Sequence, residues 1–303
     1  MSVKFENSKD AKTNIYEIAD ELNQEMVYKL TEYEDKHAAV HETRKAIKKF
    51  RALIRLIKYE VGPICYSQEN IHYRDVGREM SELRDASALI ETVDKLIESV
   101  EDKELLEILA PVKKELEDKR DEIAKAQTSL SKIIEKAVIE LKAAQKRIYT
   151  WPIESEKFQD WAFGLAKTYK NGIETMQLAF ETQNAHNFHE WRKQVKYLWN
   201  QLLFLEDTWP VMQAGITAEL SNLSSILGDE HDLNVLKEAF ENGYINMEIP
   251  VLLDKFIDDK TKQFREEATY LGLRIYAEST NSFFKKNKVY WGVYKGIEPI
   301  KTV

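Results

Sequence analysis

The stretch HETRKAIKKFRALIRLIK, from His41 to Lys58, decides how this chain folds. It contains seven lysines and arginines and a single acid, Glu42, although the whole chain has a formal net charge of −8. On a helix, with about 100° per residue, five basic side chains share an arc of about 80°. These are His41, Arg44, Lys48, Arg51 and Arg55. The opposite face carries the apolar side chains of Ile47, Phe50, Leu53, Ile54 and Ile57. The stretch therefore predicts an amphipathic helix with a basic face.

The composition is that of an ordinary folded protein. The chain has 303 residues, 43% of them hydrophobic and 32% charged, so it can bury one large core or two smaller ones. No apolar run reaches the roughly 18 residues needed to cross a bilayer, and the start MSVKFENSKDAK lacks a hydrophobic signal core. Cys65 is the single cysteine, which excludes an intrachain disulfide and a multi-cysteine metal site. We expect a cytoplasmic protein that does not contact a membrane.

Apolar residues recur at steps of three and four along most of the chain, as in NIYEIADELNQEMVYKL and LSKIIEKAVIELKAAQ. This spacing is typical of amphipathic helices, and convincing segments with a period of two are lacking. We predict an all-α protein of about eight long helices. Their expected bounds are about 10–36, 38–60, 69–99, 102–149, 156–182, 186–207, 211–240 and 248–286.

Several segments of the sequence recur at an offset of about half the chain length. HETRKAIKKF at position 41 reappears as HEWRKQVKYL at position 189, an offset of 148. LRDASAL, which contains Asp85, lies over EHDLNVL, which contains Asp232, at an offset of 147. Repetition at a fixed offset indicates that one structural unit occurs more than once. We predict two four-helix repeats, about 10–152 and 153–300, which together form one domain over residues 1–303.

The second copy also presents its cations on one face. His189, Arg192 and Lys196 occupy the same arc as the first basic face, with Lys193 beside it. In the first copy the seven cations and one acid give +6, and subtracting +6 from −8 leaves −14 for the rest of the chain. A basic patch on an acidic background steers anions toward itself. The alternative is an ordinary solvated face whose cations pair with acids on neighbouring helices.

Taken together, HETRKAIKKFR, HEWRKQVK, LRDASAL and LGDEHDLNVL resemble the CHAD domain, the conserved-histidine α-helical domain. The resemblance covers about residues 10–300. It implies two pseudo-symmetric helical bundles around a central basic groove, and non-enzymatic binding of inorganic polyphosphate in that groove. It implies no cofactor, and polyphosphate granules are a further expected location. The sequence leaves the oligomeric state open.

The resemblance implies that basic residues of both copies are the candidate polyphosphate-binding residues. They are His41, Arg44, Lys45, Lys48, Lys49, Arg51 and Arg55 in the first copy, Arg78 and Arg84 after it, and His189, Arg192, Lys193 and Lys196 in the second. Polyphosphate has no bases, so its recognition depends on phosphate contacts, in which arginine grips two oxygens and lysine acts as a mobile point charge. Binding should weaken with salt, because each neutralised phosphate releases counterions.

The second copy departs from the family's pattern. Where the family often continues Lys-Arg-x-Arg-Tyr, this chain has KYLWN, from Lys196 to Asn200. Where the family has Arg-Asp in its last motif, this chain has His231 and Asp232, so one more cation should depend on pH. These losses of positive charge predict that the first copy supplies most of the attraction.

This asymmetry makes a prediction about charge reversal. Changing Arg44 and Lys48 to glutamate should weaken binding more than the same change at Arg192 and Lys196. We expect neither change to unfold the protein, because both pairs lie opposite the apolar face and only solvated charge is altered.

Histidines occur near both repeated motifs. His37 and His41 are four residues apart, and His186 and His189 are three apart, a spacing that could hold a divalent metal on a helix. Because no cysteine and no His-Glu-x-x-His pattern supports a metal, we expect none. His41 and His189 are instead expected to donate hydrogen bonds to phosphate, which would strengthen binding as pH falls.

Asp85 and Asp232 could be catalytic carboxylates, but we interpret them as residues that orient the basic side chains. A tunnel-type triphosphatase domain with a Glu-x-Glu-x-Lys signature often accompanies the family. ESEKF at position 154 misses that spacing, and no strands are predicted to build a tunnel. We therefore expect no enzyme, and a metal-dependent phosphohydrolase is the alternative.

Aromatic residues surround the second basic motif and could stack on nucleic-acid bases. They are Trp191, Trp199, Phe204 and Trp209. At helical spacing such residues more often belong to the core. We therefore do not expect nucleic acid as a ligand, and single-stranded nucleic acid remains the alternative to polyphosphate.

Overall fold

The protein is almost entirely helical. The computed structural model describes residues 3–80, 82–125 and 128–296, without the side chains of residues 82–86, 123–125 and 128–129. It is 84% helical, and the described residues contain twelve α-helices and no strand. The predicted all-α fold is confirmed.

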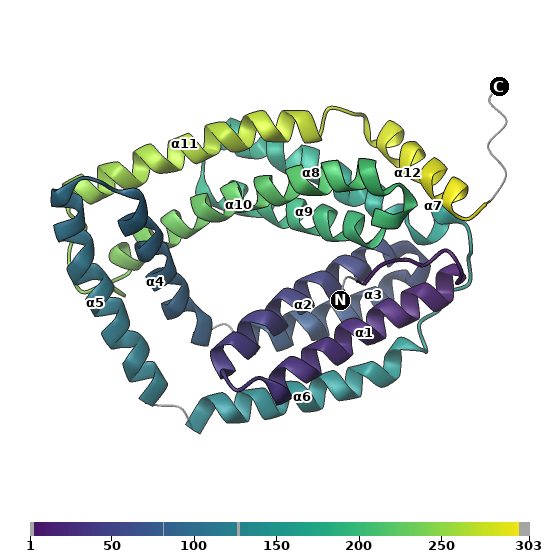
Figure 1. Cartoon of the computed structure of the whole chain (residues 1–303), viewed down its shortest axis with the longest axis horizontal. Coiled ribbons are helices and arrows are strands. Elements are labelled where there is room, and N and C mark those ends of the chain that lie inside the picture. Colours follow the sequence, from purple (N-terminus) through teal and green to yellow (C-terminus); the bar gives the residue numbers. More distant parts are fainter. Residues whose placement is uncertain (1–2, 81, 126–127, 297–303) are drawn as a thin grey trace.

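Figure 1 shows the helices in two layers joined at one end by a crossing pair. One side contains α1 (Ala11–Glu32), α2 (Lys36–Leu56), α3 (Lys58–Glu79) and α6 (Thr128–Ile148). The crossing pair is α4 (Glu82–Ser99) and α5 (Lys103–Lys125). The other side contains α7 (Phe158–Trp161), α8 (Phe163–Thr182), α9 (Ala185–Phe204), α10 (Pro210–Glu241), α11 (Val251–Ile275) and α12 (Thr280–Tyr294), with a short 3-10 turn, η1, at Glu206–Thr208.

Several of the predicted helices are wrong because each spans a break. The stretch predicted at 69–99 belongs to α3 and α4, the one at 102–149 to α5 and α6, the one at 156–182 to α7 and α8, and the one at 248–286 to α11 and α12. The hydrophobic period continues across these breaks, so periodicity alone does not reveal them. Ser279 marks one of them, because its hydroxyl accepts a hydrogen bond from the backbone N–H of Ser282 at 3.2 Å and caps the start of α12.

Helix α3 begins earlier than predicted, at Lys58 instead of about 69. Gly62 lies inside it with a φ of +76°, and Pro63 follows. A positive φ favours glycine, and proline has no N–H for the helix to use. The backbone at Gly62 is not helical, so α3 consists of two helical segments joined by a kink at these two residues.

Both basic helices have a side-chain cap at their first turn. In α2, Oδ1 of Asp35 accepts hydrogen bonds from the backbone N–H groups of His37 and Ala38, at 2.8 and 3.1 Å. In α9, Oδ1 of Asn184 accepts from the N–H of Asn187 at 2.9 Å. Such caps typically contribute about 1 kcal/mol and fix where a helix starts. The two basic faces are thereby held in a defined rotation.

The hydrophobic cores do not divide where the repeats were predicted to divide. One core runs through both sides of the molecule, from Phe50 of α2 to Trp161 of α7 and Trp191 of α9. A second core joins Val93 of α4 and the end of α10, at Leu236, with residues of α5 and α11. The crossing pair α4 and α5 therefore packs against helices of the second half. The division into two repeats stays a prediction.

The sequence contained no apolar run long enough for a bilayer. Among the described helices, none is both long and apolar enough to span a membrane.

Candidate functional site

The two basic helices, α2 and α9, lie against each other. The guanidinium carbon of Arg55 lies 4.0 Å from the centre of the Tyr197 ring, which is cation–π distance. Near it, Nε2 of Gln201 donates a hydrogen bond to the backbone carbonyl of Ala52 at 3.2 Å. The contact brings the two repeated motifs together in space, although 148 residues separate His41 from His189.

Asn70 on α3 holds two of the candidate arginines. Its Oδ1 accepts a hydrogen bond from Nη1 of Arg55 at 2.7 Å and another from Nε of Arg51 at 3.2 Å. Burial lowers the pKa of Arg51, and the neighbouring charge of Arg55 lowers it further. A neutral amide thus orients two guanidinium groups without neutralising them, and both keep their positive charge for an anion.

The first turns of α2 carry further candidates. His41 is partly exposed, with Nε2 at 3.8 Å from Oε1 of Glu42. Nη1 of Arg44 donates a hydrogen bond to the backbone carbonyl of Met80 at 3.2 Å. Nζ of Lys45 lies 2.9 Å from Oε1 of Glu42, and this hydrogen bond lowers the pKa of the carboxyl group. The one acid of the basic stretch is therefore engaged at the edge of the basic face.

Other candidates lie around this centre. Lys48 is exposed on α2, and Lys49 is half-buried on the flank of that helix. Arg78 is exposed on α3, and its charge lowers the pKa of Asp75, behind the stronger effect of the Arg74 hydrogen bond. The side chains of Arg84 and of Asp85 lie outside the part that the structure describes.

In the second copy, Arg192 is more buried than the sequence suggested. A Cβ added to Gly228 of α10 would lie only 3.3 Å from its Nη2, so the guanidinium rests against the glycine. Nε of Arg192 is buried and has no hydrogen-bond partner among the described atoms. Burial lowers the pKa of Arg192, opposed by the charges of Asp232, Asp229 and Glu230.

Lys196 lies one turn further along α9 and is the most perturbed cation of the site. Burial, together with the charges of Arg192 and Lys48, lowers its pKa to about 7, against the opposing charge of Asp232. Among the described side chains, none forms an ion pair with Lys196. The expectation that Arg192 and Lys196 carry fully solvated charge is therefore wrong. Lys193, beside them, is partly exposed, and its Nζ lies 2.7 Å from Oε1 of Glu190.

The histidines of the second copy pack against each other. The rings of His189 and His231 have centroids 4.5 Å apart. Burial lowers the pKa of His189, and burial together with the charge of His189 and nearby cations lowers that of His231 to about 3. The expectation that His231 adds a pH-dependent cation near neutrality is wrong, because burial among cations keeps its ring neutral. His189 is likewise a weaker base than an exposed histidine.

Asp232 of α10 lies close enough to Arg192, Lys95 and Lys196 for their charges to affect its pKa. Burial raises the pKa of its carboxyl group, against the opposing charges of Arg192 and Lys95. Lys95 of α4 is itself bonded to Asp229, one turn earlier on α10, at 2.7 Å. The carboxylate is therefore surrounded by cations that it can orient.

The aromatic residues near the second motif divide into two groups. Trp191 is fully buried and Phe204 is 3% exposed, which confirms the core interpretation for both. Trp199 is partly buried against the same core. The interpretation is wrong for Trp209, which is 47% exposed and packs edge-to-face on Tyr290 at 4.8 Å. Trp209 follows the end of α9, where helical spacing no longer places it on the core face.

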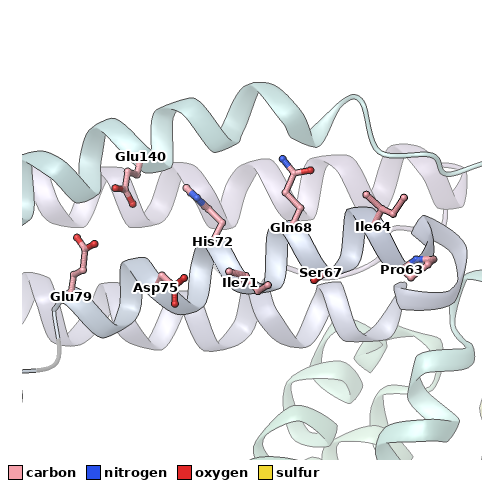
Figure 2. A pocket seen from close by; sticks show the side chains of 9 residues that line it. All are labelled: Pro63, Ile64, Ser67, Gln68, Ile71, His72, Asp75, Glu79 and Glu140. Carbon is pink, nitrogen blue, oxygen red and sulfur yellow. The ribbon is translucent and has the colours of Figure 1, made fainter.

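Two cavities of the described part of the chain lie away from the candidate residues. One, of about 910 Å³, lies between α3 and α6. Figure 2 shows that Glu79 of α3 and Glu140 of α6 point into the space between these helices, near His72. Acidic side chains make this cavity unsuitable for a polyanion. A second cavity, of about 400 Å³, involves Lys237 and Arg265 but none of the candidates. A central basic groove therefore stays a prediction.

The sequence could also have supported a metal site through its histidine pairs. Among the described residues, no group of three or more His, Cys, Asp or Glu side chains is arranged to hold a metal ion. His189 instead lies near the cations Lys193 and Arg192, which disfavour a bound cation.

Three functional residues were not found from the sequence. Asn70 and Tyr197 orient arginines, and Gly228 allows Arg192 to approach α10. Of these, Gly228 had a local signal, because it stands in the repeated segment LGDEHDLNVL. Tyr197 also stands in a repeated segment, HEWRKQVKYL, whereas Asn70 had no local signal, because its partners lie on another helix.

Comparison with known families points to the same segment of the chain. A family model described as CHAD domain matches residues 18–241. A search of curated proteins finds no significant match. The matched range runs from within α1 to the end of α10 and contains every candidate residue.

Proposed function

The chain belongs to the CHAD domain family, and from this premise we propose that it binds inorganic polyphosphate through the basic residues of α2 and α9 without hydrolysing it. Binding would take place in the cytoplasm, including on polyphosphate granules. The proposal needs no cofactor and no metal.

One observation carries the proposal: cations of α2 and α9 converge, and two of them, Arg192 and Lys196, are desolvated. Arg192 and Lys48 are close enough to Lys196 to lower its pKa, behind the effect of burial. Neither Arg192 nor Lys196 forms an ion pair within the described part of the chain. Desolvated cations without counter-ions cost free energy in the unliganded protein. An anionic ligand would remove that cost, and such perturbed clusters are typical of binding sites.

A long polyanion fits this arrangement better than a small anion does. The candidates of α2 extend from His41 to Arg55, along most of a helix of 21 residues. At 1.5 Å per residue, the segment from His41 to Arg55 is about 21 Å long. A chain of phosphates can contact successive cations along that length, whereas triphosphate reaches only a few of them.

Asp232 supports a role in binding over one in catalysis. A catalytic base must reach the proton that it removes, and a carboxylate held among cations is better placed to orient them. Arg192, Lys95 and Lys196 all influence the pKa of Asp232. We therefore assign it the orientation of Arg192 and Lys196.

The test is a titration of the protein with long-chain polyphosphate, triphosphate and single-stranded DNA, side by side, by isothermal titration calorimetry. We expect tight binding of long polyphosphate and much weaker binding of triphosphate. Binding of DNA as tight as that of polyphosphate would favour the nucleic-acid alternative, in which exposed Trp209 is available for stacking. Equal competition by triphosphate would indicate a small pocket and contradict the proposal.

The same samples test hydrolysis. Polyphosphate is incubated with the protein and Mg²⁺ or Mn²⁺, and released orthophosphate is measured. We expect no release above the protein-free control. Release that Asp232→Asn abolishes would establish the phosphohydrolase alternative.

A further inference from the structure

We propose that the cavity between α10 and α11 binds a basic amino acid, a small molecule with two cationic groups and one carboxylate. The two helices lie side by side (Figure 1), and the cavity has a volume of about 400 Å³, which is within the range of small-molecule sites. None of the candidate polyphosphate-binding residues lines it. Its α11 wall also lies beyond the matched residues 18–241. The inference therefore goes beyond the proposed function and does not depend on it.

Arg265 of α11 is held in place at one end of the cavity. Its Nε and Nη2 donate hydrogen bonds to Oε1 of Glu230 at 2.9 and 2.8 Å, and its Nη1 donates to the backbone carbonyl of Gln183 at the end of α8. Nδ2 of Asn234, another lining residue, donates to the same Oε1 at 2.9 Å. Glu230 is only 1% exposed. These bonds fix the end of the cavity before any ligand binds.

The hydroxyl of Thr261 lacks a partner in the protein. Thr261 lines the cavity from α11 and is only 7% exposed, and its Oγ1 is buried with no hydrogen-bond partner among the described atoms. Thr269 of the same helix instead donates to the backbone carbonyl of Arg265, four residues earlier, at 2.6 Å. A buried hydroxyl without a partner costs free energy. A polar ligand in the cavity can supply the missing partner.

Two of the three cations that line the cavity are already paired. Arg265 is bonded to Glu230, as described above, and Nζ of Lys237 lies 2.7 Å from Asp254 and 2.8 Å from Asp258. Lys262 of α11 is the third. It is exposed, and it forms no ion pair with any residue that the structure describes. Its charge is therefore available to a ligand.

The α10 wall carries two acids that are also available. Glu238 and Glu241 line the cavity, and their spacing of three residues places them on one face of the helix. Both are exposed, and neither has an ion-pair partner within residues 3–80, 82–125 and 128–296. The cavity thus offers two negative charges on α10 and, from Lys262, one positive charge on α11.

A basic amino acid carries the complementary charges. Its two cationic groups match Glu238 and Glu241, its carboxylate matches Lys262, and its polar groups can bond the hydroxyl of Thr261. A neutral amino acid leaves one carboxylate of α10 unpaired, and a diamine leaves Lys262 unpaired. These differences make the charge pattern testable with three small molecules.

The experiment is isothermal titration calorimetry with L-lysine, L-leucine and cadaverine. L-leucine lacks the second cationic group, and cadaverine lacks the carboxylate. We expect L-lysine to bind with a Kd on the order of 0.1 mM, and each of the other two to bind at least about tenfold more weakly. Equal binding of all three, or no binding of L-lysine at about 10 mM, would overturn the inference.

Two charge variants test the walls separately. Glu238→Gln with Glu241→Gln should lose the preference for L-lysine over L-leucine. Lys262→Gln should weaken L-lysine at least about fivefold and leave cadaverine unaffected. The matched control is Glu219→Gln with Glu266→Gln, which makes the same change in charge at exposed positions of α10 and α11 outside the cavity. An equal loss in this control would show that only net charge matters and would overturn the inference.

Thr261→Val tests the buried hydroxyl, because valine keeps the shape of threonine and removes its polar atom. Without ligand, the variant should melt at a higher temperature than the wild type, since the unpartnered hydroxyl is gone. It should also bind L-lysine several-fold more weakly. Weaker binding by a protein of raised melting temperature cannot come from a damaged fold and supports the inference. Wild-type affinity for L-lysine in Thr261→Val would overturn the placement of the ligand in this cavity.

Discussion

The guanidinium of Arg55 on α2 lies 4.0 Å from the centre of the Tyr197 ring on α9. The first basic helix is thus anchored to the second by a side chain that stands where the first copy has Lys49. The second copy has lost a cation at this position and gained a surface on which Arg55 rests. Tyr197 therefore contributes to the site by positioning Arg55.

Replacing Tyr197 tests this positioning. Tyr197→Phe retains an aromatic ring and should bind polyphosphate nearly as well as the wild type. Tyr197→Leu removes a cation–π contact of about 0.5–2 kcal/mol and should weaken binding about two- to fivefold. Calorimetry measures the affinity, and thermal unfolding shows whether the fold is retained. Wild-type affinity in a folded Tyr197→Leu protein would show that Arg55 needs no such support.

Replacing Asn70 by aspartate would neutralise Arg51 and Arg55 with almost no change in the shape of the side chain. Asn70→Asp places a carboxylate where Oδ1 now lies 2.7 Å from Arg55 and 3.2 Å from Arg51. The new ion pairs should stabilise the fold by roughly 1 kcal/mol and weaken polyphosphate binding several-fold, because both arginines lose positive potential.

The matched control for this change is Asn222→Asp, which adds the same charge at an exposed position of α10. It should leave both the melting temperature and the affinity nearly unchanged. If both variants weaken binding equally, the effect reflects net charge and Asn70 has no particular role.

Gly228 tests the placement of Arg192. In Gly228→Ala, the new Cβ would lie 3.3 Å from Nη2 of Arg192, so the guanidinium must move. We expect binding to weaken about three- to tenfold, because a misplaced cation loses its phosphate contact. Gly215→Ala is the control, since nothing lies within 4 Å of a Cβ added there on the same helix. That variant should gain up to about 1 kcal/mol from helix propensity and bind as the wild type does.

We expect the buried amine of Lys196 to lower the free energy of unfolding. Its pKa of about 7 lies below the ordinary 10.5, so the unfolded chain binds more protons than the folded protein between these values. The free energy of unfolding therefore rises with pH through this window, and the full penalty is present below pH 7. Lys196→Met should raise stability at pH 7 by about 1–2 kcal/mol and weaken binding.

Chemical denaturation at pH 6 and pH 10 measures the free energy of unfolding of the wild type and of Lys196→Met. The gain from Lys196→Met should be largest at pH 6 and should shrink toward pH 10. Lys193→Met, at a partly exposed position of α9, should change stability by less than about 0.5 kcal/mol. A variant less stable than the wild type at pH 6 would contradict the account of Lys196 as a buried, unbalanced cation.

Features of the fold that depend on neighbouring residues in the chain were predicted from the sequence better than features that depend on contacts between helices. The all-α fold and the amphipathic faces follow from periodicity, and both were predicted. The break before α12 was not, because a cap at Ser279 interrupts an apolar pattern that continues through it. Helix ends depend on how a few backbone N–H and C=O groups are capped, and the spacing of apolar residues carries no information about capping.

The sequence predicted which residues belong to the candidate site, but it did not predict how deeply they are buried or how their pKa values shift. The helical arc places Arg192 and Lys196 with the cations of the first copy, yet only the packing of α10 over α9 shows that both are desolvated. The same packing lowers the pKa of His231 to about 3, which reversed its expected role. Burial and long-range charge are tertiary properties, and a repeat in the sequence does not contain them.

Charge reversal on α2 tests the central claim most directly. The variant Arg44→Glu with Lys48→Glu is compared with Lys103→Glu with Lys114→Glu, which makes the same change in net charge at exposed positions of α5. Polyphosphate affinity is measured by calorimetry at ~50 and ~200 mM salt, and circular dichroism confirms that each variant is folded. We predict that the α2 variant loses at least about tenfold in affinity and has a shallower salt dependence, because it neutralises fewer phosphates. The α5 variant should bind nearly as the wild type does. Equal affinity of the two variants would contradict recognition of polyphosphate through the basic face of α2.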